Sequence, residues 1–86
     1  MVHCVIESLP DYSLKKPIPI VIDSDLVVSW IDAHVHAQGE TQEDAIENLK
    51  DMIQITYEER VESIDVLSRY LKECFQVMEE YIGGRR

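Results

Sequence analysis

The fold of this chain is decided by residues 30–53, which read WIDAHVHAQGETQEDAIENLKDMI. Apolar residues alternate with histidines over residues 33–38, the period-two pattern of a half-buried strand. Gly39 breaks this pattern as a residue that tolerates a positive φ, and Thr41 with Asp44 then forms a capping-box pattern. The stripe of an amphipathic helix follows at spacings of three and four: Ala45, Ile46, Leu49, Met52, Ile53 and Thr56.

Two further strands precede this junction. Isoleucines alternate over residues 18–22, and residues 26–31 are almost entirely apolar. Pro19 cannot donate to a ladder, so the first strand is expected at a sheet edge or to begin just after the proline. Asp23-Ser24-Asp25 is a turn of the kind that Asx side chains stabilise. The pattern predicts an α+β fold in which a three-stranded antiparallel sheet is followed by a helix over about residues 41–57, packed on one face.

The strand at residues 26–31 is apolar on both faces. One helix covers only one face of a sheet, so the face that carries Trp30 is expected to need a second cover. That cover is either the C-terminal helix of the same chain or another subunit. The residues predicted to form an oligomer interface are Leu26, Val28, Trp30, Leu67, Leu71 and Met78.

A C-terminal amphipathic helix is predicted over about residues 64–82. Its heptad-like seam comprises Ile64, Leu67, Leu71, Cys74, Met78 and Tyr81. This seam is expected either to pack on the sheet of its own chain or to contact a second chain. Both would hold if two chains exchanged their C-terminal helices in a domain swap. Gly83-Gly84 is expected to end the helix, with Arg85-Arg86 as a frayed tail. Residues 1–16 are ambiguous, with a candidate short strand at residues 4–6.

The 86 residues are expected to form one domain, with a core at about residues 12–57. The chain carries 17 acidic and 8 basic side chains, a net charge of −9, and residues 40–65 contain only Lys50 and Arg60 as basic residues. Such a surface repels phosphate backbones and attracts a basic protein, or it serves only as a solvated face. We therefore expect no direct contact with nucleic acid. The residues predicted to bind a partner are Glu40, Glu43, Asp44, Glu47 and Asp51.

Cys4 and Cys74 are far apart and in no metal-type spacing, which favours a reduced, cytoplasmic protein. No apolar run is long enough to span a membrane, and the first residues lack the pattern of a signal peptide. His34 and His36 would lie about 7 Å apart on one strand face, which is half of a metal site. No further ligand stands at a recognisable spacing, so an exposed polar face is the preferred interpretation. We expect no cofactor, no metal and no catalysis.

Residues 35–50, VHAQGETQEDAIENLK, resemble the signature S-Q-G-D-T-x-E-E-A-x-x-N-x-K of the HicB-like antitoxin family. The strands at Ile18–Asp23 and Leu26–Asp32 fall where that family places its first hairpin, and Tyr12–Ile18 resembles the lead-in of its small members. The resemblance covers roughly residues 12–57. It implies a β-β-β-α core that is partly like a double-stranded-RNA-binding domain, without catalysis. It also implies a role in binding and neutralising a small basic HicA-type mRNA interferase.

The chain departs from the family in two places. After Tyr57 the sequence predicts one long helix without a basic recognition face, where many members carry a DNA-binding part. The proline- and cysteine-containing turn before the third strand is missing. Members without the DNA-binding part include solitary proteins. We expect the chain to assemble as a homodimer or higher homo-oligomer. The alternatives to an antitoxin are a solitary oligomeric scaffold or ligand-binding protein with no toxin partner, and a metal-dependent enzyme using His34 and His36.

Overall fold

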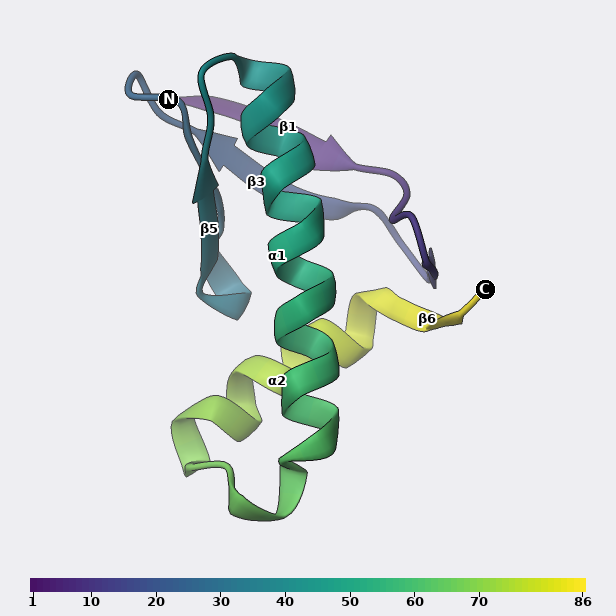
Figure 1. Ribbon diagram of the computed structural model, residues 1–86. Coiled ribbons are helices and arrows are strands. Elements are labelled where there is room, and N and C mark those ends of the chain that lie inside the picture. Colours follow the sequence, from purple (N-terminus) through teal and green to yellow (C-terminus); the bar gives the residue numbers. More distant parts are fainter.

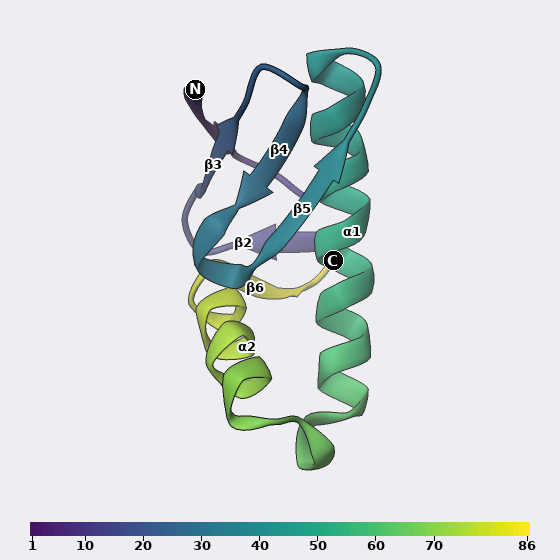
Figure 2. The same ribbon diagram turned by 90° about the vertical axis from the view of Figure 1, so that its left-hand side faces the viewer.

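The computed structural model describes the backbone of residues 1–86 and every side chain except that of Ile64. Four strands form an antiparallel sheet in the order β1-β3-β4-β5, with the bounds Val2–Ile6, Ile18–Ile22, Val27–Trp30 and Val35–Gln38. The helices are α1 (Gln42–Glu62) and α2 (Arg69–Tyr81), and short 3-10 turns are η1 (Ile31–Ala33) and η2 (Ile64–Val66). Figure 1 shows these elements along the chain. A small second sheet joins β2 (Tyr12–Leu14) to β6 (Ile82–Arg85), which lie side by side in Figure 2.

The predicted α+β class is confirmed, but the large sheet has four strands where three were expected. The additional strand is β1, which pairs with β3 along its whole length. Pro19 lies within β3 even though β3 is not an edge strand. The ladder from β3 to β4 begins only at Val21, opposite Ser29, so the proline occupies a part of β3 that pairs with β1 alone.

Thr41 caps α1 as the sequence predicted, because its Oγ1 accepts a hydrogen bond from the Asp44 backbone N–H at 3.1 Å. Gly39, two residues before Thr41, has a different role from the one expected. Gly39 does not adopt a positive φ. Instead, an added Cβ would overlap the backbone nitrogen of Ala45 and come within 2.8 Å of its Cα. Glycine is required here because β5 returns tightly against the first turn of α1.

The C-terminal helix begins later than predicted. Ser68 caps it, its Oγ accepting a hydrogen bond from the Leu71 backbone N–H at 3.3 Å, and α2 starts at Arg69. Ile64, which opens the predicted seam, lies outside the described side chains. The prediction of a frayed tail was wrong, because β6 pairs with β2 and the Arg86 backbone N–H donates to the Asp11 carbonyl at 2.8 Å.

The core lies between one face of the four-stranded sheet and the two helices (Figure 2). Strand residues of even number in β3 and β4 point into it, in keeping with the period-two alternation of a strand. α1 contributes Ala45, Leu49 and Ile53 to this cluster, and α2 contributes Met78. The sheet contributes Ile6, Ile18, Ile20, Ile22, Val28, Trp30 and Val35.

Trp30 lies in this core with no solvent-exposed surface. Its ring packs edge-on against the ring of Tyr81 in α2, with centroids 5.2 Å apart and an interplanar angle of 83°. The second cover expected for the Trp30 face is therefore α2 of the same chain. The face left uncovered by the helices is the opposite one, formed by the odd-numbered residues of β1, β3 and β4.

A buried glutamine in α1 holds the loop before β2. The Gln54 Oε1 accepts a hydrogen bond from the Asp11 backbone N–H at 2.9 Å, and its Nε2 donates to the Asp11 carboxylate at 3.3 Å. Only 8% of Gln54 is exposed, so these bonds satisfy an amide that would otherwise be buried without partners. The contact links α1 to the small sheet.

Replacing Gln54 by alanine is expected to lower the free energy of unfolding by about 1–3 kcal/mol, because the Asp11 backbone N–H loses its acceptor. Urea denaturation of Gln54→Ala measures this loss. Gln42→Ala, at the exposed first position of α1, is the matched control and is expected to change little. Equal urea midpoints for the two variants would contradict a stabilising role for the hydrogen bonds between Gln54 and Asp11.

Candidate functional site

The residues predicted to bind a partner gather at the junction of β5 and α1. Glu40, Asp44 and Glu47 line a shallow depression of about 600 Å³, together with neighbouring residues of β5 and the turn. Glu43 and Asp51 are exposed on the same helix, one turn before and one turn after Glu47. We call these five residues the acidic junction. The structure therefore brings three of them around one depression and leaves all five accessible.

The acidic junction is held rigidly by the start of α1. The Asn48 Nδ2 donates to the Gln38 carbonyl at 2.9 Å, which ties the helix back to β5. The carboxylates of the first turn also interact favourably with the positive end of the helix dipole. The Lys50 Nζ lies 3.4 Å from the Glu47 Oε1, and a surface pair of this kind contributes little to stability. Lys50 is the one basic residue among residues 40–51, so the negative charge of the acidic junction has little local compensation.

The histidine pair predicted on one strand face is not formed. His34 adopts a left-handed conformation with φ 56°, at the end of η1, and β5 begins only at Val35. Its ring tilts against the ring of Tyr70 in α2, with centroids 5.1 Å apart. His36 lies in β5 opposite Ser29. Among the described residues, no group of three or more His, Cys, Asp or Glu is placed to hold a metal ion.

The residues predicted to form an oligomer interface are dispersed. Val28, Trp30 and Met78 have no exposed surface within a single chain, so in this fold they offer nothing for a second copy to contact. Leu26 is half-buried in the turn before β4 with φ 60°, and its backbone N–H donates to the Asp23 carbonyl at 3.2 Å. Leu67 and Leu71 are half-buried at the start of α2. The structure therefore places the even-numbered face of β4 in the core of a single chain, which is one of the two covers that the sequence left open.

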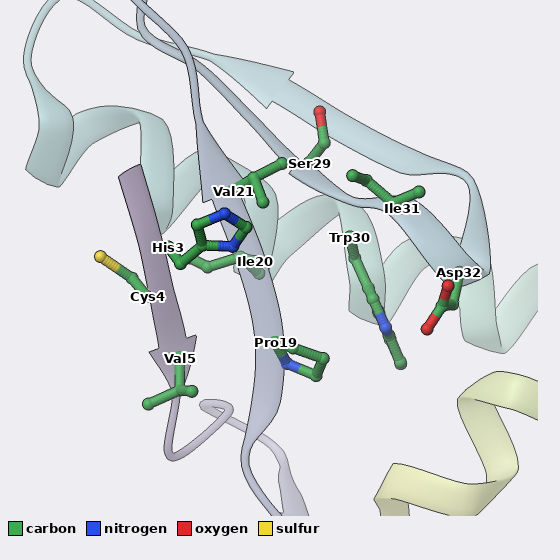
Figure 3. Close-up of a pocket in the computed structure, with 10 residues that line it drawn as sticks. All are labelled: His3, Cys4, Val5, Pro19, Ile20, Val21, Ser29, Trp30, Ile31 and Asp32. Carbon is green, nitrogen blue, oxygen red and sulfur yellow. The ribbon is translucent and has the colours of Figure 1, made fainter. Parts of the chain in front are cut away.

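The uncovered face of the large sheet was not among the predicted sites. It carries a depression of about 600 Å³ between β1, β3 and β4, shown in Figure 3. Val5 and Ile31 are 53% and 57% exposed there. We call this the outer face, formed by His3, Val5, Pro19, Val21, Ser29 and Ile31. The sequence did hold the pattern that marks it, because none of the four strands contains Asp, Glu, Lys or Arg.

Two tyrosines, Tyr12 and Tyr57, have phenol groups that burial affects. The pKa of Tyr12 is raised above its ordinary value, mainly because the side chain is buried. The hydrogen bond that its hydroxyl donates to the Glu58 carboxylate at 3.0 Å raises the pKa further. Burial also raises the pKa of Tyr57, whose ring packs against Tyr12 and Phe75. These phenols therefore stay neutral at neutral pH. Cys4 is half-buried and Cys74 buried, and the two are not joined in a disulfide.

The fold and these surfaces define an α+β protein with an acidic helix start on one side and an uncharged sheet face on another. Comparisons with protein-family models, curated proteins and solved structures gave no match for this chain. Within the described residues, no helix combines the length and the apolar character needed to cross a membrane.

Proposed function

We propose that this chain is a non-catalytic, HicB-like antitoxin that binds and neutralises a small basic HicA-type mRNA interferase. The observation that carries the proposal is the acidic junction, where five carboxylates are exposed on a capped, tethered helix start. The residues that resemble the family signature, 35–50, include four of the five junction residues, all except Asp51. Resemblance and electrostatics thus point to one surface.

Inhibition in this proposal is steric and electrostatic. The net charge of −9 speeds the encounter with a basic partner, and the junction carboxylates pair with Lys and Arg side chains that would otherwise hold RNA phosphates. Covering those side chains excludes the substrate from the toxin. The same charge disfavours direct binding of this chain to nucleic acid.

The proposal predicts that binding depends on the junction rather than on net charge alone. The test takes as the binding partner any small basic HicA-type protein that the native host encodes beside this gene, and measures its capture at about 50 mM and about 500 mM salt. We expect Glu43→Gln/Glu47→Gln/Asp51→Asn to weaken capture at least about tenfold at low salt. The control Glu73→Gln/Glu79→Gln/Glu80→Gln removes the same charge from exposed positions of α2 and is expected to retain capture.

Two results would contradict this proposal. One is the absence of any small basic protein in the capture from the native host. The other is an equal loss of binding in the junction variant and in the α2 control, which would show that only overall charge matters. Circular dichroism of both variants checks that each remains folded, which is expected because all six carboxylates are exposed.

A further inference from the structure

The strand β1 is an unprotected sheet edge. The sheet order places it outermost beside β3, whereas the other edge strand, β5, packs against α1 (Figure 2). Natural edge strands are shielded from further pairing by charged side chains, prolines or bulges. The sequence of β1, VHCVI, has neither proline nor formally charged residue, and it pairs with β3 in unbroken register. Its Val2 and Val5 are each 53% exposed.

The pairing of β1 with β3 determines which backbone groups of the edge are free. Val5 lies opposite Pro19, which has no N–H, so this must be a non-hydrogen-bonded pair. Hydrogen-bonded and non-hydrogen-bonded pairs alternate, so Cys4 exchanges its hydrogen bonds with Ile20. The backbone N–H and C=O groups of His3 and Val5 therefore point away from β3, toward the open edge.

We propose that a second copy of this chain pairs with it through β1, in an antiparallel arrangement centred on Cys4. In this register His3 of each copy exchanges backbone hydrogen bonds with Val5 of the other, so the groups that point outward are all used. Val2 then lies opposite Ile6, and Cys4 lies opposite Cys4. The result is one continuous sheet of eight strands with a two-fold axis at its centre.

The chemistry of the edge favours a second copy as the occupant. An isologous interface needs a self-complementary surface, and an antiparallel strand pair centred on one residue has that property. Two chains of net charge −9 repel each other at most orientations. They meet here through β1, which contains no Asp or Glu, so the paired strands themselves place no side-chain carboxylates against each other. A basic partner gains no ion pair at this edge.

Joining the edges also extends the outer face. The register centred on Cys4 pairs odd-numbered residues with odd-numbered ones, so side chains that point to the same face of each sheet meet. The exposed Val5 then lies beside His3 of the other copy, and the depression lined by Val5, Pro19 and Ile31 continues across the two-fold axis. The helices of both copies stay together on the opposite side. The acidic junction remains free, so this inference does not depend on the antitoxin proposal.

The proposed register has a direct chemical test. Cys4 would face Cys4 as a non-hydrogen-bonded pair, with Cα atoms about 4.5 Å apart, and a disulfide spans about 4.4–6.8 Å. In Cys74→Ser, oxidised glutathione should convert the two thiols to one disulfide, taking up the two electrons and two protons. We expect a cross-linked dimer on a non-reducing gel, and none for Cys4→Ser.

A pair of edge variants tests the hydrogen bonds without oxidant. Val5→Pro removes the outward N–H that the second copy needs, and it leaves the β1–β3 ladder intact because that N–H is not used there. Val5→Thr keeps the N–H and is the matched control. Sedimentation equilibrium should give about twice the 10.0 kDa chain mass for the natural chain and for Val5→Thr. Val5→Pro should shift the dissociation constant upward at least about tenfold.

Three outcomes would overturn the inference: a mass of 10.0 kDa for the natural chain at about 100 μM, a dimer that Val5→Pro leaves unchanged, or a dimer in which Cys74→Ser does not cross-link. Circular dichroism of Val5→Pro confirms that a loss of mass is not a loss of fold. None of these measurements involves the acidic junction. A failure here is therefore separable from a failure to bind a basic toxin.

Discussion

Replacing Trp30 by alanine is expected to lower the free energy of unfolding by about 3–5 kcal/mol. The side chain is fully buried, and its ring contacts Tyr81 edge-on at 5.2 Å between centroids. Its loss leaves a cavity where the sheet meets α2. A domain of this size has a stability of only about 4–13 kcal/mol, so Trp30→Ala removes a large share of it.

A second substitution separates the effect of losing the buried ring from the effect of losing the indole N–H. Among the described residues, the Trp30 Nε1 has no hydrogen-bond partner, which costs about 1–3 kcal/mol for a buried donor. Trp30→Phe keeps much of the ring and removes that donor, so we expect a clearly smaller loss than for alanine. Val66→Ala, at an exposed position, is the control and should change stability little. Thermal and urea unfolding measure all three, and a loss below about 1 kcal/mol for Trp30→Ala would contradict the burial.

Replacing Gly39 by alanine is expected to destabilise the fold by about 1–3 kcal/mol or more. The added methyl group would overlap the Ala45 nitrogen and approach the Ala45 Cα and the Asp44 carbonyl carbon to 2.8 Å each. All three are backbone atoms in the first turn of α1, so relief requires moving the helix start away from β5. That movement would also disturb the Thr41 cap and the bond from Asn48 to Gln38.

Gly84 provides the matched control for this change. An added Cβ there meets no heavy atom within 4 Å, and Gly84→Ala is expected to leave stability within about 0.5 kcal/mol. Urea denaturation of the two variants side by side gives the comparison. Equal stabilities would show that β5 does not return as closely to α1 as the structure indicates.

Local sequence patterns predicted the elements that depend on local interactions. The Thr41 cap and the stripe at Ala45, Leu49 and Ile53 involve residues within a few positions of one another, and the structure has both. β1 was ambiguous because nothing within residues 1–16 indicates its partner, β3. The pairing of β2 with β6 joins segments about 70 residues apart in the sequence, so no local pattern could predict it. Gly83 and Gly84 of β6 also fit the pattern of a helix end, which favoured the wrong prediction of a frayed tail.

The candidate surfaces were predictable to different extents. The acidic junction follows from composition and from one helix start, so the residues were identified before their arrangement was known. The face of β4 that would be covered depended on where α2 packs, which periodicity alone does not give. The position of His34 was missed because a single left-handed residue interrupts an otherwise regular alternation. The outer face was marked by an absence of charge, a pattern that becomes informative only when the strands are placed side by side.

The fluorescence of Trp30 on dilution tests most directly whether this chain covers its own sheet with α1 and α2. The chain has one tryptophan, so the signal has a single source. The structure predicts blue-shifted emission that resists acrylamide quenching, and both should remain unchanged when any dimer is diluted to monomers. A red shift and easy quenching in the monomer would show that another subunit, rather than α2, covers the indole.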